Sequence, residues 1–228
     1  MNRLWLIAAF CLCFALQDGL TQSGRTLAVL YFENNSLSKK AEMEPLCKGL
    51  TDMLITELGK IEQFQVVERA QLQQLLEEMK LGQSGVIDSQ SAVEVGKMLG
   101  AQNMLLGSFM HMLDGKLRID VRIVNVETGV TIKAEEVTGK PKDLYKLLQG
   151  LVVKIARNLD IKLTRTDTQR LEQVENKSFT AALFYAKGLE YEDAGDNVHA
   201  VEMYEKALQE NTGFSKARER ITALTKKQ

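Results

Sequence analysis

The sequence has few residues of the types that build chemical sites. Among 228 residues there are two histidines, His111 and His199, and three cysteines. A metal site needs several ligands that converge on one point, and no motif brings these residues together. The sequence therefore predicts no metal and no other cofactor.

The chain also lacks an excess of charge of either sign. It has 29 basic and 30 acidic residues, interleaved along its length. A nucleic-acid-binding surface needs clustered basic residues, so a nucleic-acid partner is excluded. Because 45% of the residues are hydrophobic, the chain can form a substantial core.

Catalytic motifs are missing as well. The two-glycine segment 82–85 is not followed by the Lys-Ser/Thr pair of a phosphate-binding loop. The carboxylates of Glu77-Glu78 and of Glu135-Glu136 are adjacent in sequence, so they diverge on a helix or strand. We predict that the protein is not an enzyme and has no small-molecule substrate. The alternative is a hydrolase assembled in space around His111.

The N-terminus has the form of a secretory signal. Arg3 precedes the apolar run Leu4–Leu16, and polar residues follow up to Ser23. The run is short for a membrane span, so residues 1–23 are predicted to be a signal peptide cleaved after Ser23. An uncleaved anchor is the alternative.

Cysteine usage argues against lipidation. Cys11 follows Phe10 and Cys13 follows Leu12, whereas a bacterial lipobox has a small residue before the cysteine. Beyond residue 23 only Cys47 remains, so no internal disulfide can form. Cys47 lies in a helical apolar pattern and is predicted to be a small buried hydrophobe.

Residues 24–162 show the periodicities of an α/β domain. Early alternation of strands and helices indicates parallel strand pairing, and Asp114-Gly115 indicates a later antiparallel hairpin. We predict a mixed five-stranded sheet packed with helices. The expected strands are 26–33, 64–68, 102–113, 117–126 and 130–137; the expected helices include 46–58, 72–79, 90–99 and 143–159.

After a polar segment, 163–178, predicted to be a partly helical linker, the pattern changes to that of a small all-α helical repeat, 179–228. Gly188 and Ala200 are small where two helices must approach, and Tyr191 and Tyr204 are expected to fill the space between them. The repeat signature, which is also a candidate partner surface, consists of Phe184, Gly188, Tyr191, Gly195, Ala200, Tyr204 and Ala207.

This C-terminal unit resembles one tetratricopeptide repeat with a capping helix. It departs from that family at Lys187, where Leu is usual, and at Thr212, where Pro is usual. A single repeat offers little groove, because arrays need about three repeats to bury a continuous core. We therefore favour docking on the first domain or self-assembly over peptide binding.

Residues 26–160 resemble the CsgG family of curli-secretion proteins and its FlgO-type flagellar, holdfast-anchoring and penicillin-binding-protein-activating relatives. The resemblance rests on LAVLYFENNS, VVER, LQQLLEE, GKMLGAQNMLLGS and RIVNVETG, in that order. It implies a cell-envelope location, an α/β periplasmic domain and assembly with itself or with envelope partners.

The joint Asp114-Gly115-Lys116 limits that resemblance. The channel-forming member carries two long membrane insertions, one of them here, and a membrane-spanning strand needs roughly 9–11 residues. Neither this joint nor Thr138–Lys142 is long enough, so we predict the soluble version of the fold. The alternative is that Met104–Val126 itself crosses the membrane in an oligomer.

The resemblance and the signal together predict an exported periplasmic protein of the cell envelope. It is expected to act as a binding or assembly factor for a secretion or surface-structure apparatus of the curli, flagellum or cell-wall type. Its expected partners are envelope proteins and further copies of itself, with peripheral association at the outer membrane permitted. The alternative is a subunit of an oligomeric outer-membrane secretion channel.

Overall fold

The computed structural model describes residues 24–80, 88–173 and 178–226. The expected signal peptide, residues 1–23, lies outside the described residues, as does most of the loop 82–88. Across the described ranges, each helix is too short or too polar to span a membrane.

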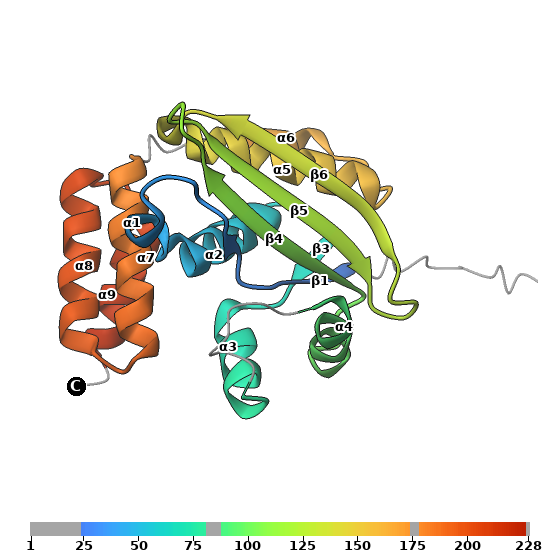
Figure 1. Cartoon of the computed structure of the whole chain (residues 1–228), viewed down its shortest axis with the longest axis horizontal. Coiled ribbons are helices and arrows are strands. Elements are labelled where there is room, and N and C mark those ends of the chain that lie inside the picture. Colours follow the sequence, from blue (N-terminus) through green and yellow to red (C-terminus); the bar gives the residue numbers. More distant parts are fainter. Residues whose placement is uncertain (1–23, 81–87, 174–177, 227–228) are drawn as a thin grey trace, which may run out of the picture.

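A mixed sheet forms the centre of the first domain (Figure 1). Its strands follow the order β3-β1-β4-β5-β6, in which β1 pairs parallel with β3 and β4, and β5 pairs antiparallel with β4 and β6. This confirms the predicted mixed sheet. The bounds are β1 Arg25–Val29, β3 Phe64–Val66, β4 Asn103–His111, β5 Leu117–Asn125 and β6 Thr131–Gly139.

One predicted strand is interrupted. The segment 26–33 forms β1 and then leaves the sheet, because the Phe32 backbone N–H donates to the Cys47 carbonyl at 3.1 Å. The chain returns as the short strand β2 (Glu33–Asn34), which pairs parallel with β4. The sheet thus has six strands instead of the five expected.

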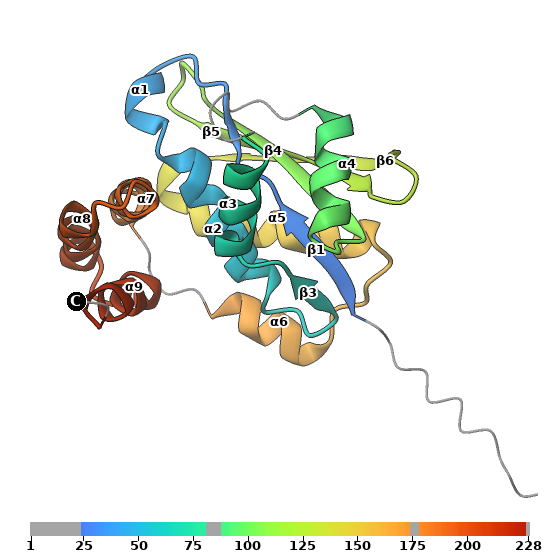
Figure 2. The same cartoon turned by 90° about the horizontal axis from the view of Figure 1, so that it is seen from below.

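Helices cover both faces of the sheet, which gives the domain two apolar cores (Figures 1 and 2). On one face, α2 (Leu46–Leu58) and α5 (Leu144–Asn158) pack against alternate residues of β5. On the other face, α3 (Arg69–Glu78) and α4 (Ser89–Met98) pack against β1 and β4. Two short elements complete the domain, α1 (Lys40–Met43) and the 3₁₀ turn η1 (Pro141–Asp143).

The segment expected to be a linker is a linker only in part. Residues Arg165–Glu172 form α6, which begins with a capping box between Thr164 and Asp167. Leu171 is only 4% exposed and belongs to the same core as α5. Because a buried leucine anchors it, α6 is a fixed part of the first domain.

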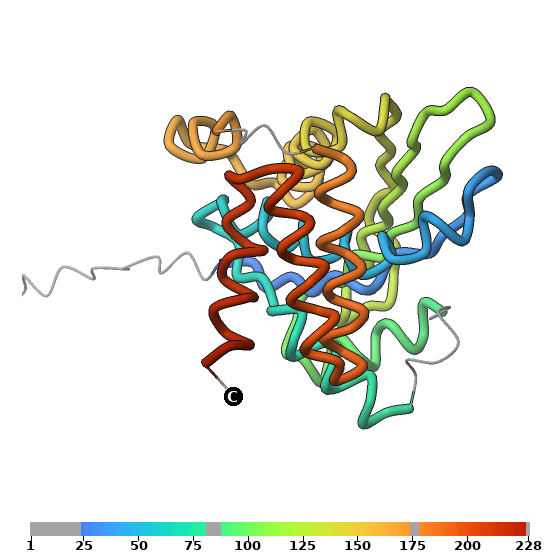
Figure 3. The backbone as a smooth tube through the Cα atoms, turned by 90° about the vertical axis from the view of Figure 1, so that its left-hand side faces the viewer, coloured from blue at the N-terminus to red at the C-terminus, as the bar shows by residue number. Residues whose placement is uncertain are grey.

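Three helices follow, α7 (Phe179–Asp193), α8 (Asn197–Glu210) and α9 (Ser215–Thr225). They lie at one end of the molecule (Figure 1), where they run side by side (Figure 3). Their facing side chains form a third apolar core, which includes Tyr185, Leu189, Tyr204 and Phe214. The predicted all-α unit is therefore present.

Candidate functional site

Four signature residues lie where α7 and α8 meet. A Cβ atom on Gly188 would come within 2.3 Å of the Tyr204 ring, so only glycine permits this approach. Tyr204, Ala200 and Ala207 are fully buried in the third core. These residues therefore hold the helical hairpin together, and their side chains are closed to a partner.

The other signature residues are more open. Tyr191 is 39% exposed and stacks on His199 with ring centroids 5.3 Å apart, so it does not fill the space between the helices as expected. Phe184 is half-buried against the third core. Gly195 has a φ of +78° in the turn between the helices, a conformation that favours glycine.

The helical unit docks on the first domain through α7 and α2. A Cβ atom on Gly49 would lie 2.6 Å from the Ala186 Cβ, so the two backbones are nearly in contact. Ala182 and Ala186 belong to the same buried core as the α2 leucines. One continuous apolar core therefore joins the two units.

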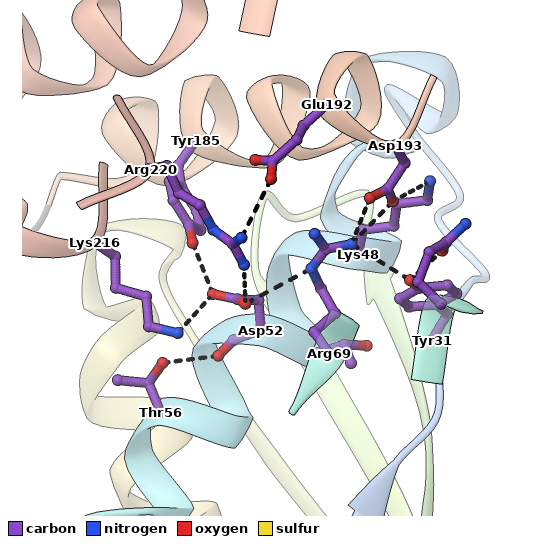
Figure 4. A network of polar contacts seen from close by, with 12 residues as sticks. Tyr31, Lys48, Asp52, Thr56, Arg69, Tyr185, Glu192, Asp193, Lys216 and Arg220 are labelled. Atoms are coloured by element: carbon purple, nitrogen blue, oxygen red, sulfur yellow. Dashed lines mark hydrogen bonds and ion pairs between the residues drawn. The ribbon is translucent and has the colours of Figure 1, made fainter. Parts of the chain in front are cut away.

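Beside this apolar contact lies a buried polar cluster, which we call the interdomain ion cluster (Figure 4). Asp52 of α2, 1% exposed, is at its centre. Its carboxylate accepts hydrogen bonds from the Tyr185 hydroxyl at 2.8 Å and from Lys216 Nζ at 3.2 Å. Its Oδ1 atom lies 3.7 Å from both Arg69 Nε and Arg220 Nη2. Asp52 thus links α2 to α3, α7 and α9.

A second carboxylate completes the link to α3. Arg69 Nη1 donates to Asp193 Oδ1 and Oδ2 at 2.8 and 2.9 Å. Lys48 Nζ donates to Asp193 Oδ2 at 2.6 Å and lies 5.7 Å from the centre of the Tyr31 ring. Arg69 and Asp193 have side chains only 3% and 8% exposed, so this is a buried ion pair.

Glu192 ties the cluster to the inside of the helical unit. It accepts hydrogen bonds from the Tyr204 hydroxyl at 2.6 Å and from Arg220 Nη1 at 3.2 Å. The cluster therefore sets three carboxylates, Asp52, Glu192 and Asp193, against four cations, Lys48, Arg69, Lys216 and Arg220.

The surroundings favour charged cations and neutral phenols. Burial by itself would lower the pKa of Arg69, but Asp193, Tyr31 and Asp52 outweigh it and raise that pKa above its ordinary value. Burial and the Asp52 charge raise the pKa of Tyr185 well above the ordinary range. Burial is the main reason why the pKa of Tyr31 is raised to about 12. The phenols therefore stay protonated: the Tyr185 hydroxyl donates to Asp52, while the Tyr31 hydroxyl donates to Gln73 and accepts from Arg69 Nη1 at 3.4 Å.

The cluster can hold elements together, but it has little space for a substrate. The cavity beside Tyr185 and Lys216 measures only about 10 Å³, roughly the space of one water. Among residues 24–80, 88–173 and 178–226, no group of three His, Cys, Asp or Glu side chains could hold a metal ion. His111 Nδ1 lies 2.7 Å from Ser38 Oγ in the loop between β2 and α1, while His199 pairs with Asp196 in the helical unit.

Sequence reasoning missed this cluster. Asp52 interrupts an apolar helix and Arg69 ends the VVER motif, so two charges adjoin residues expected to be buried. The signal was therefore a charge at a core position, which needs a partner. Asp193, the closest carboxylate partner of Arg69, is far away in the sequence, and no local pattern identifies it.

The first domain also has an open groove of about 330 Å³ on the sheet face that α3 and α4 cover only in part. Leu30, Leu76 and Leu106 provide its apolar surface. Arg118 donates to the Asp120 carboxylate at 2.7–3.0 Å and pairs with Glu136 at the rim. An apolar floor with paired charges at the rim suits a protein segment better than a small ion.

One family model matches the N-terminal half of the chain. Residues 15–113 match the family model described as curli production assembly/transport component CsgG, which confirms the CsgG-like resemblance. The matched part ends in the β4–β5 turn. No curated protein matches the chain.

Several solved structures are similar to part of the chain. The LpoB C-terminal domain from Escherichia coli is 18% identical, with 54% of this chain and 87% of that one covered and a TM-score of 0.39. Lipoprotein GNA1162 from Neisseria meningitidis is 11% identical, with 60% and 98% covered and a TM-score of 0.38. The PelC dodecamer from Paraburkholderia phytofirmans is 14% identical, with 61% and 90% covered and a TM-score of 0.37.

Proposed function

We propose that this protein, whose residues 15–113 match the CsgG family, is exported to the cell envelope and acts there as a binding and assembly factor. It would serve a secretion or surface-structure apparatus of the curli, flagellum or cell-wall type. Its partners would be envelope proteins or further copies of the chain, and it would act by binding rather than by catalysis.

One observation supports a binding role above others. The helical unit is locked to α2 and α3 by the interdomain ion cluster, while the groove on the sheet face stays open. Buried ion pairs fix the relative position of the elements that they join, because either charge alone is costly to bury. A partner would therefore meet a preformed surface, which lowers the ordering cost of binding.

Photo-crosslinking in cells tests the groove as the partner surface. A benzophenone amino acid replaces Arg122, which is exposed beside the groove, and a matched variant carries it at exposed Arg157 of α5. We expect a crosslinked envelope protein at position 122 and none of that mass at position 157. Equal products at both positions, or uncrosslinked monomer alone at native expression levels, would contradict the proposal.

Cell fractionation tests export separately. The expected result is a shortened chain outside the cytoplasm. A full-length cytoplasmic product would overturn the envelope location whatever the crosslinking experiment shows.

A further inference from the structure

One end of the sheet carries two exposed leucines. Leu113, in the turn between β4 and β5, is 80% exposed, and Leu37, just before α1, is 61% exposed. The two segments protrude at the same end of the molecule in Figures 2 and 3. Burial normally stabilises such side chains, so the two leucines give this tip an apolar surface that a partner could cover.

Buried polar contacts hold this tip in place. The Leu37 N–H donates to the His111 carbonyl at 3.0 Å, and Ser38 Oγ lies 2.7 Å from His111 Nδ1. The His111 N–H in turn donates to Ser36 Oγ at 3.0 Å. His111 is only 9% exposed. The loop that bears Leu37 is therefore pinned to the end of β4, two residues from Leu113.

Lysines surround the two leucines. Lys39 and Lys40 follow Leu37, and Lys116 lies in the same turn as Leu113. Gly139 pairs with Leu117, so Lys140 and Lys142 lie at this end of the sheet too. Glu42 lies 3.7 Å from Lys39, and Asp114 lies 2.7 Å from Lys116. Glu44 and Asp143 adjoin these segments too, so the five lysines meet the four carboxylates of Glu42, Glu44, Asp114 and Asp143, and the tip keeps an excess of one positive charge.

We propose that this tip docks on the surface of a bilayer that contains anionic lipid. Leucine side chains enter the boundary between headgroups and acyl chains, while lysines bind the anionic headgroups. The apolar stems of the lysines can lie along that boundary with their charges in water. A second copy is a poorer occupant, because two tips would bring like charges together. The proposal does not depend on the protein partner proposed above.

Tryptophan fluorescence of the full chain tests this docking locally. Trp5, the one native tryptophan, is first replaced by Phe. Leu113→Trp then reports from the tip, and Val130→Trp reports from an exposed site at the opposite end of β5. Vesicles of phosphatidylglycerol and brominated phosphatidylcholine should shift the Leu113→Trp emission to shorter wavelength and quench it. The Val130→Trp emission should not change.

Charge removal tests the anionic preference. Lys40→Gln and Lys140→Gln should each weaken the vesicle affinity of the Leu113→Trp protein by about fivefold, since one lysine near an anionic surface contributes about a factor of this size. Lys97→Gln and Lys162→Gln, exposed elsewhere, are the matched controls and should have little effect.

Three outcomes would overturn the proposal. The first is no response of the tip tryptophan to anionic vesicles. The second is an equal response to vesicles of phosphatidylcholine alone. The third is a spectral shift that depends on protein concentration without lipid, which would assign the tip to a second copy of the chain. The substitutions are at exposed positions, so unfolding, checked by circular dichroism, is not expected to obscure the result.

Discussion

The carboxylate of Asp52 accepts a 2.8 Å hydrogen bond from the Tyr185 hydroxyl, although 133 positions separate the two residues. Asp52 is 1% exposed and Tyr185 is fully buried. Their contact joins the first domain to the helical unit at a point that water does not reach. Substitutions at this contact therefore measure how firmly the two units are joined.

Tyr185→Phe removes this hydrogen bond and retains the ring, which packs 4.8 Å from Phe214 between centroids. A hydrogen bond to a charged group contributes about 1.5–3 kcal/mol. We expect the free energy of unfolding in urea to fall by about 2 kcal/mol, within that range. Tyr191→Phe, at a partly exposed ring, is the control and should change it by less than about 0.5 kcal/mol.

Asp193→Ala leaves Arg69 buried without its closest carboxylate partner. Removing one member of a buried pair costs about 3–5 kcal/mol. By contrast, Glu202→Gln breaks a solvent-exposed pair with Lys206 and should leave the free energy of unfolding nearly unchanged, because water and salt screen such pairs. Chemical denaturation measures both.

The double variant Arg69→Met/Asp193→Leu distinguishes charge burial from lost packing. It should recover much of the stability lost in Asp193→Ala, because apolar residues of similar volume can replace a buried ion pair. A double variant no more stable than Asp193→Ala would contradict this account.

Gly188→Ala places a methyl group against the Tyr204 ring and should destabilise the helical unit. Overpacking of this kind costs about 1–3 kcal/mol. Gly150→Ala, in α5, is the matched control, since its Cβ would have no neighbour closer than 4.0 Å. That substitution should be stabilising by about 0.5–1 kcal/mol, because alanine favours the helix. Thermal unfolding of both variants gives the comparison.

Cys47 should be a slow nucleophile in the folded protein. Burial, and then the nearby Glu44 carboxylate, raise the pKa of its thiol from 9.0 to about 12. Near pH 8 the thiolate fraction of Cys47 is therefore about a thousandfold lower than that of a thiol with the ordinary pKa, and alkylation depends on the thiolate. Iodoacetamide labelling of a Cys11→Ser/Cys13→Ser protein, with and without urea, checks this; equal rates would refute it.

The sign of the linked pH effect follows from the same shift. The folded state disfavours the Cys47 thiolate. The stability contributed by the protonated thiol is therefore complete at pH values below the unfolded-state pKa near 9. That contribution should decline as the pH rises from about 9 towards 12. Cys47→Ala should remove this part of the pH dependence.

The sequence predicts the elements whose burial is one-sided and local. β5 alternates between buried and open residues, and α5 carries an apolar stripe, so both were predicted close to their observed bounds. The strand 26–33 was predicted without its interruption, because the hydrogen bond from Phe32 to the Cys47 carbonyl is a tertiary contact. Leu171 likewise gave α6 a place in the core that its polar composition did not indicate.

Local sequence patterns could not predict the candidate site, because its contacts are tertiary too. Asp52 lies in a helix whose buried side becomes fully covered only when α7 and α9 pack on it. The signature predicted Gly188 and Tyr204 correctly as a close helix contact, since both belong to one hairpin. It could not identify which helix of the first domain the hairpin would meet.

The near-contact of Gly49 with Ala186 has a consequence for how the chain melts. Since α2 and α7 contribute to one apolar core, neither unit can lose its structure without exposing the leucines and charges of the other. Heat should therefore unfold both together, in a single calorimetric transition whose van't Hoff and calorimetric enthalpies agree. A truncated protein of residues 24–162, without the helical unit, would therefore not fold as an independent domain.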